Sequence, residues 1–188
     1  MKRFLSMISL VCACTLVQAQ TALPPVWQSD TQKEVQVSTR TIAYLPPTRI
    51  VWQETTGESS IQGLENLLLP GNGQADLFDG QITRIKNGAT GKASFLLDFG
   101  RELQGGIQVV TGRSSKKEMK IRVRFGESVS EAMCDITPEN GATNDHAIRD
   151  FYLTLPWLGV AEIGNSGFRF VRIDLEEPDA ELSLKEIR

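Results

Sequence analysis

The feature that most constrains this fold is an alternation of apolar and polar residues with a period of two. In the clearest example, Ile121, Val123 and Phe125 alternate with Arg122 and Arg124. Side chains of a β-strand point alternately to its two faces, so this pattern predicts a strand with one face in a core and one toward water. Further strands are predicted at residues 50–52, 94–99, 107–110, 151–155, 168–175 and 182–187.

Turn-forming residues separate these predicted strands. They are Asn87-Gly88, Gly105-Gly106, Gly112, Asn140-Gly141, Gly164-Asn165 and Pro178-Asp179. Glycine and asparagine accept the backbone conformations that tight turns need, and proline presets them. Short strands with turns between them, and one wet face each, predict an antiparallel β-sandwich or barrel.

One short helix is predicted over residues 59–73. Ser59 is placed to cap it, and Gln62 three residues later would complete a capping box. Apolar residues then recur at helical spacing, at Ile61, Leu64, Leu67 and Leu68. Pro70-Gly71 is expected to end the helix.

The first residues have the pattern of a secretion signal. Lys2 and Arg3 precede an apolar run, and the small residue Ala19 is suited to cleavage. The domains expected are therefore a signal peptide at 1–19, an extended arm at 20–48 with a short strand near 41–45, and a β-sandwich at 49–188. Export to the periplasm or the extracellular space follows. Lipidation at Cys14 is the less favoured alternative, because Cys12 fits the lipoprotein pattern poorly.

Composition excludes several classes of function. Removing the two basic residues of the leader from the 20 basic residues of the chain leaves 18 against 23 acidic residues, a net charge of −5. Nucleic acid is therefore not an expected partner, because binding it needs a basic surface. No second long apolar run exists, so no transmembrane segment is expected in the mature chain. Cys134 would remain as the only cysteine, which we interpret as a small packing residue.

No cofactor and no metal are predicted. The segment Gly88-Ala89-Thr90-Gly91-Lys92 lacks the first glycine of a phosphate-binding loop and its final Ser or Thr. The mature chain has one histidine and one cysteine, too few for a zinc site. Glycoside hydrolysis needs only two facing carboxylates, and the acidic residues near predicted strand ends are Glu54, Glu58, Glu127, Glu131, Asp145 and Asp150. The sequence does not pair them, so no catalytic residue is assigned.

The long connection 127–150 is the candidate ligand-binding or docking surface. It contains Asn144, Asp145, His146 and Arg149, whose side chains offer hydrogen bonds to hydroxyl groups. Trp157 is a candidate apolar wall, because a planar ring packs against a sugar face. Two alternatives stay open: the polar side chains satisfy only the backbone of their own loop, and Trp157 is part of the core.

Several segments resemble the β-sandwich that precedes the catalytic barrel of bacterial α-L-rhamnosidases. The similar runs are Ile121-Arg122-Val123-Arg124-Phe125-Gly126-Glu127-Ser128, Asp150-Phe151-Tyr152-Leu153, Gly167-Phe168-Arg169-Phe170-Val171-Arg172-Ile173 and Leu97-Asp98-Phe99-Gly100-Arg101-Glu102-Leu103-Gln104-Gly105-Gly106. The ending Leu184-Lys185-Glu186-Ile187-Arg188 is similar to galactose-binding-type jelly rolls.

The resemblance implies an all-β fold: an antiparallel β-sandwich of the jelly-roll, galactose-binding-domain-like type, attached to an (α/α)6 barrel. It also implies inverting hydrolysis of terminal rhamnose by carboxylates of that barrel, none of which can be carried onto this chain. The first functional hypothesis is therefore a non-catalytic module that frames a carbohydrate-processing barrel. The alternative is a free-standing carbohydrate-binding module. The expected partners are rhamnose-containing plant or pectic glycans, or the barrel itself.

Overall fold

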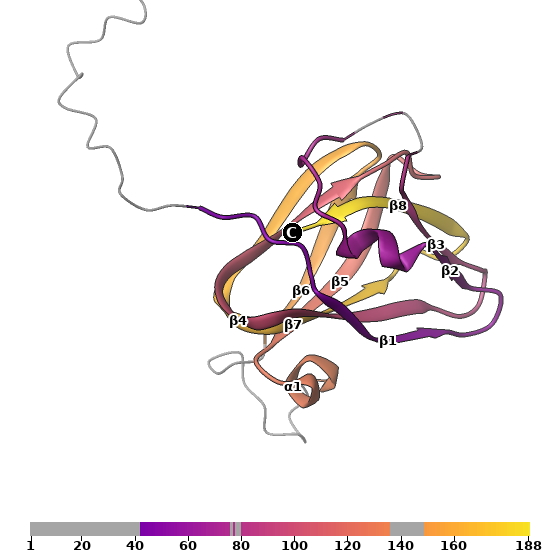
Figure 1. Ribbon diagram of the computed structural model, residues 1–188. Helices are drawn as coiled ribbons and strands as arrows, with labels where there is room; N and C mark the ends of the chain where they lie inside the picture. Colours follow the sequence, from indigo (N-terminus) through magenta and orange to yellow (C-terminus); the bar gives the residue numbers. More distant parts are fainter. Residues whose placement is uncertain (1–41, 76, 78–79, 136–148) are drawn as a thin grey trace, which may run out of the picture. The chain divides into compact units, whose positions relative to one another are not determined.

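The computed structural model describes residues 42–75, 77, 80–135 and 149–188, and it places Ala43–Arg188 in one compact unit (Figure 1). Its strands are β1 (Arg49–Thr55), β2 (Ser60–Gln62), β3 (Thr83–Asn87), β4 (Ala93–Thr111), β5 (Glu118–Gly126), β6 (Arg149–Pro156), β7 (Gly159–Leu175) and β8 (Ala180–Ile187). A 3₁₀ helix, η2 (Leu64–Leu68), and an α-helix, α1 (Val129–Met133), complete the described elements. Every strand pairing among these residues is antiparallel, which confirms the predicted all-β class.

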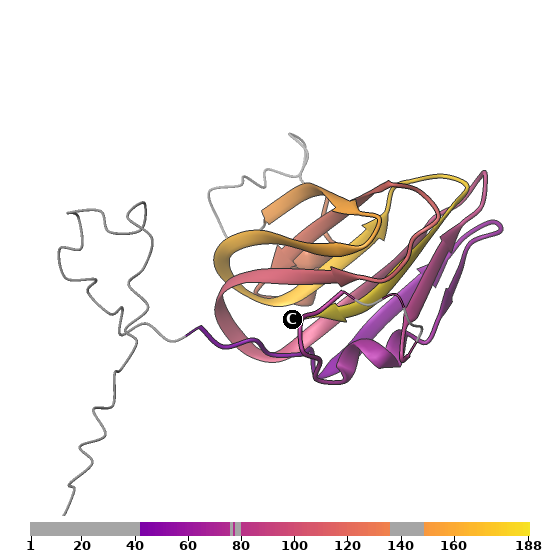
Figure 2. The same ribbon diagram turned by 90° about the horizontal axis from the view of Figure 1, so that it is seen from above.

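Two long strands, β4 and β7, belong to both layers of the sandwich. The first half of β4 pairs with β1 and with the second half of β7, and β5 and β6 extend this layer, called here the lower layer. The second half of β4 pairs with the first half of β7 and with β8, and β3 and β2 extend the upper layer. Figures 1 and 2 show β4 and β7 curving together from one layer into the other.

The prediction of turns at Gly105-Gly106 and Gly164-Asn165 is wrong, because β4 and β7 continue through both sites. Their pairing shifts register between Gly105 and Ile107, where the two strands bend. A Cβ on Gly106 would lie 2.4 Å from the carbonyl oxygen of Gly164, and a Cβ on Gly164 would lie 2.8 Å from the Phe125 ring. These glycines therefore allow two backbones to approach beneath an aromatic ring at the bend.

The apolar positions of the alternating strands form the core between the layers. Phe125 is fully buried, and its ring meets those of Phe168 and Phe151 edge to face, at centroid distances of 5.0 and 6.1 Å. Phe99 packs on Phe168 in the same way at 5.5 Å. Phe125, which the alternation places on the core face of its strand, is 0% exposed, as predicted. Phe170, for which the sequence also predicts burial, is 7% exposed, but it lies in a separate cluster with Leu96 and Ala132 on the other face of the lower layer.

The helix predicted over residues 59–73 is largely wrong. Its first turn is strand β2, which pairs with β3. Ser59 accepts a hydrogen bond from the Gly88 N–H at 3.4 Å instead of capping a helix. Gly63, with φ of 66°, turns the chain into the short helix η2, which buries Leu64 and Leu67. Pairing with β3 outweighs the local helical spacing, because three residues cannot make a stable helix without packing.

A capping box occurs in α1, which lies within the connection 127–150, where the sequence predicts no helix. The Ser128 hydroxyl accepts from the Glu131 N–H at 3.3 Å, and the Glu131 carboxylate accepts from the Ser128 N–H at 3.3 Å. Glu131 also accepts from the Glu127 N–H at 2.8 Å. Ala132 then packs on Leu96 and Phe170, on the face of the lower layer that points away from the main core.

An ion pair joins two of the segments named in the resemblance, 97–106 and 167–173. Asp98 on β4 accepts two hydrogen bonds from Arg169 on β7, at 2.9 and 3.1 Å, and one from Arg49 at 2.7 Å. Gly126, in the third segment, lies against α1, where a Cβ would meet the Ala132 nitrogen at 2.6 Å. The ion pairs link β4 to β7 and β1 within the lower layer, and Gly126 lets α1 lie close against it.

The remaining turn predictions have mixed outcomes. Asn87-Gly88, Gly112 and Pro178-Asp179 follow or separate strands as expected. Asn140-Gly141 lies outside the described residues. The strand expected near 41–45 is not formed by its described residues, which run from Ile42 to Leu45.

Candidate functional site

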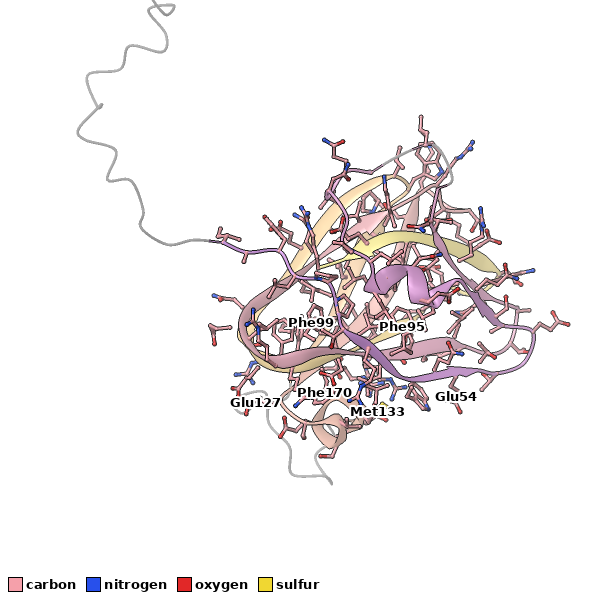
Figure 3. All side chains as sticks on the ribbon, viewed as in Figure 1. Glu54, Phe95, Phe99, Glu127, Met133 and Phe170 are labelled. Carbon is pink, nitrogen blue, oxygen red and sulfur yellow. The ribbon has the colours of Figure 1, made fainter. Side chains whose placement is uncertain are left out.

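The candidate site is a pocket of about 280 Å³ on the outer face of the lower layer. Figure 3 shows Phe95 and Phe99 between the layers, and Glu54, Met133 and Phe170 on the opposite side, which is the side of α1. All the residues that line the pocket are polar: Glu54, Thr56, Lys92, Ser94, Arg122, Arg124, Asp135, Arg172, Asp174 and Glu176. A fully polar lining in a sandwich distinguishes this hollow from a packing defect, which would be apolar.

Sheet register brings these side chains together from four strands. Arg124 lies opposite Arg172, and Arg122 lies opposite Asp174. Ser94 lies opposite both Asp174 on one side and Glu54 on the other. Directly paired residues of an antiparallel sheet point to the same face, so the polar positions of four amphipathic strands form one continuous surface.

A buried ion-pair network forms the floor of the pocket. The Asp174 carboxylate accepts from Nη2 of Arg124 at 2.8 Å and from Nε of Arg172 at 2.9 Å. The side chains of Asp174 and Arg124 are only 4% and 2% exposed. Charge-assisted bonds of this length, with both partners out of water, fix the positions of both guanidinium groups.

A second group of ion pairs borders the pocket on the side of β6. Asp150 accepts two hydrogen bonds from Arg122, of which the Nε bond measures 2.8 Å. Asp135 contacts both Arg124, at 2.8 Å, and Arg122, at 3.2 Å. Its carboxylate is 62% exposed, so this acceptor can be reached from solvent.

The opposite border of the pocket carries one ion pair and one carboxylate that has no ion-pair partner among the described residues. Lys92 pairs with Glu176 at 2.9 Å. Glu54 is exposed, lines the pocket and makes no ion pair with any residue that the structure describes. The pocket therefore offers guanidinium donors on its floor and a free carboxylate acceptor at its edge.

Two aromatic residues flank the polar pocket. The Trp52 ring lies 5.0 Å below the guanidinium carbon of Arg172, which holds that arginine over the apolar cluster beneath α1. Tyr152 lies opposite Arg122 on β6, is 58% exposed, and has the Lys120 ammonium 4.4 Å from its ring centre. Tyr152 thus gives an exposed ring next to the pocket.

The network fixes charge states. Burial alone would raise the pKa of Asp174, but hydrogen bonds from Ser94 and Arg124 and the charge of Arg172 hold it below its usual value. The hydrogen bonds from Arg122 to Asp150 raise the pKa of Arg122. Asp174 is therefore an ionised acceptor at neutral pH, and the arginines are permanent donors.

The structure places two of the five sequence-predicted site residues. Arg149 begins β6, opposite Phe125, and Trp157 follows the end of the same strand, so about 26 Å of extended chain separates them. Trp157 is 40% exposed, and its backbone carbonyl accepts a hydrogen bond from the Ser114 N–H at 3.2 Å. Asn144, Asp145 and His146 lie outside the described residues.

The pocket was missed by sequence reasoning, although its residues were visible in the strand pattern. Arg122 and Arg124 were interpreted as the water-facing side of a strand. Their partner Asp174 is 50 residues beyond Arg124, a separation that no local motif reports. Of the acidic residues considered for hydrolysis, Asp150 is bound to Arg122, Glu131 caps α1, and Glu54 alone lines the pocket.

The described part of the chain contains no group of three or more His, Cys, Asp or Glu side chains placed to hold a metal ion. None of its helices is long and apolar enough to cross a membrane.

Comparison with known proteins finds similarity only at the level of structure. No family model matches the chain. No curated protein matches it either.

Among solved structures, a fucose binding module of Streptococcus pneumoniae, SpX-3, is 16% identical, with a TM-score of 0.45 over 76% of this chain and 96% of its own. A rhamnosidase from Klebsiella oxytoca with rhamnose bound is 14% identical, with a TM-score of 0.45, and the match spans 76% of this chain but 27% of the enzyme. The CBM32 module of AlyQ, solved with 4,5-unsaturated mannuronic acid, is 11% identical, with a TM-score of 0.42 over 75% of this chain and 95% of the module.

Proposed function

We propose that this chain is a carbohydrate-binding module whose ligand occupies the outer-face pocket of the lower layer. The observation that carries the proposal is the lining of that pocket, in which fixed arginine donors face an unpaired, exposed carboxylate. A sugar hydroxyl both donates and accepts hydrogen bonds, so two neighbouring hydroxyls match a guanidinium and a carboxylate together.

The rigidity of the pocket supports binding. Its arginines are held by ion pairs and by the Trp52 ring before any ligand arrives, so little side-chain entropy is lost on binding. The exposed Tyr152 ring beside Arg122 adds an apolar surface for the face of a sugar. The proposal rests on this geometry and not on the solved structures named above, whose TM-scores are below 0.5.

The role proposed is binding without catalysis. A glycosidase needs one carboxyl group that keeps its proton near neutral pH, to protonate the leaving group. In the pocket, Asp174 is held ionised, Glu176 pairs with Lys92, and Asp135 pairs with two arginines. Those carboxylates act here as acceptors that orient the cations. Glu54, the fourth lining acid, has no second unpaired carboxyl group among the described lining residues to act with.

The test is binding of the purified full chain to an array of immobilised glycans. Thr56→Trp fills the pocket from its exposed edge, and we expect it to lower the signal at least tenfold. Thr55→Trp is the matched control, because Thr55 is the exposed neighbour and is not among the lining residues. Equal binding by both variants and the wild type would place the ligand elsewhere, and no binding of any glycan by the wild type would overturn the proposal.

The finer hypothesis, that this module frames the barrel of an α-L-rhamnosidase-like hydrolase in an exported protein, rests on the sequence resemblance and the signal pattern. Two experiments test its two parts. Co-expression with any all-helical domain encoded downstream tests the role beside a barrel, and N-terminal sequencing of the exported form tests export. A mature chain starting at Gln20 would support export, and one starting at an acylated Cys14 would replace simple secretion with lipid anchoring.

A further inference from the structure

Resting on the proposed function, we propose that the pocket selects neutral sugars and rejects hexuronic acids, with Glu54 as the residue that decides between them. The charges of the pocket carry this inference. Its lining contributes four cations and four acids: Lys92, Arg122, Arg124 and Arg172, and Glu54, Asp135, Asp174 and Glu176. Asp150, bound to Arg122 at the border, adds one more negative charge.

The positive charges are not available to an acidic ligand. Arg124 and Arg172 share Asp174, Arg122 is taken by Asp150 and Asp135, and Lys92 is taken by Glu176. A ligand carboxylate would have to displace one of these acids from its partner, and that would leave the displaced charge without compensation. A hydroxyl group needs no such exchange, because it can accept a hydrogen bond from a guanidinium N–H and donate one to a carboxylate while the ion pairs stay in place.

Glu54 is the one lining acid without an ion-pair partner among the described residues. It is exposed at the edge of the pocket, where its negative charge faces an entering ligand. It would repel a second carboxylate, and the local dielectric beside a sheet makes that repulsion stronger than in bulk water. With a neutral sugar, the same carboxylate accepts a charge-assisted hydrogen bond from a hydroxyl.

The pocket has room for about one sugar unit. The volume of about 280 Å³ lies just below the range of about 300–1,000 Å³ that holds drug-sized ligands. The discrimination therefore concerns the substituents of one ring, and above all whether carbon 6 is a hydroxymethyl or methyl group or a carboxylate.

The experiment compares methyl glycosides that share ring configuration and differ at carbon 6. Methyl galactoside is paired with methyl galacturonide, and methyl glucoside with methyl glucuronide, each titrated into the full chain at low ionic strength. We expect the neutral member of at least one pair to bind at least tenfold more tightly. Raising the salt concentration should narrow that ratio, because it screens the repulsion.

Glu54→Gln separates this inference from general pocket binding, with Glu102→Gln, an exposed acid of β4, as the matched control. We expect Glu54→Gln to reduce the neutral-to-acidic ratio below about threefold, and Glu102→Gln to leave it unchanged. Equal or tighter binding of the hexuronides by the wild type would overturn the inference while leaving carbohydrate binding in place. An unchanged ratio in Glu54→Gln would remove Glu54 from its role, and no binding of either member of any pair would overturn the proposed function as well.

Discussion

Replacing Asp174 with asparagine removes the charge that the floor of the pocket is built around. Asp174 is 4% exposed and accepts hydrogen bonds from Arg124 and Arg172. Asparagine keeps the size of the side chain but carries no charge and only one oxygen. The change therefore leaves Arg124, which is 2% exposed, with Asp135 as its remaining carboxylate.

The expected cost follows from this burial. Breaking a buried ion pair by removing one partner costs about 3–5 kcal/mol, because the other charge stays out of water without compensation. Asp135 still neutralises part of the Arg124 charge, so we expect the lower end, about 3 kcal/mol. For a domain of this size that corresponds to a fall in Tm of roughly 6–12 °C.

Urea and thermal unfolding of the full chain, followed by circular dichroism, measure this loss. Asp135→Asn is the control: its carboxylate is 62% exposed, so it should cost under about 1 kcal/mol. The double variant Arg124→Met/Asp174→Leu removes both charges and should recover most of the stability lost by Asp174→Asn. A loss below about 1 kcal/mol in Asp174→Asn, or no recovery in the double variant, would refute the reasoning that a buried charge pair organises this face.

Three further changes test other parts of the structure. The hydrogen bond from Arg169 lowers the pKa of Asp98 from 3.8 to about 2; burial opposes this shift, and the Gly100 N–H and Arg49 add to it. The ionised Asp98 therefore stabilises the fold by about 2 kcal/mol. This stabilisation is complete above the unfolded pKa and is lost as the pH falls from about 4 through about 2. Unfolding as a function of pH should show that fall in the wild type and not in Asp98→Asn, and parallel curves would contradict it. Gly126→Ala drives a Cβ into the backbone of α1 and should lower the stability by about 1–3 kcal/mol. Ser128→Ala removes one helix cap and should cost less, about 1 kcal/mol. If urea unfolding gave the reverse order, α1 would not rest on Gly126. Phe125→Ala empties a fully buried site between Phe151 and Phe168 and should lower the stability by about 3–5 kcal/mol, whereas a midpoint like that of the wild type would show that its strand faces outward.

The strands could be predicted from the sequence because burial on one face imposes a local period of two. Ile121, Val123 and Phe125 are all fully buried, as their spacing indicates. The wrong predictions concern glycines and residues whose structure depends on strand pairing. Gly106 and Gly164 were interpreted as turns, since their role depends on an approach between strands that are more than 50 residues apart.

The outer face was harder to predict for the same reason. The polar residues of β5 look water-facing, yet Arg124 is 2% exposed, because Asp174 from β7 and Asp135 after α1 enclose it. In a sequence that alternates apolar and polar residues, a buried arginine cannot be distinguished from an exposed one. Only the register of β5 against β7 distinguishes them, and that register is set by contacts far apart in the sequence.

The most direct measurement of the central claim is a nuclear magnetic resonance titration of the ¹⁵N-labelled full chain that follows the Nε–H signals of its arginines. With methyl galactoside or methyl glucoside as the probe, we expect saturable shifts at Arg122, Arg124 and Arg172, and none at Arg169, which pairs with Asp98 outside the pocket lining. Saturable shifts confined to the indole signal of Trp157, or no shift at any arginine up to a large excess of sugar, would contradict the claim that this polar pocket is the binding site.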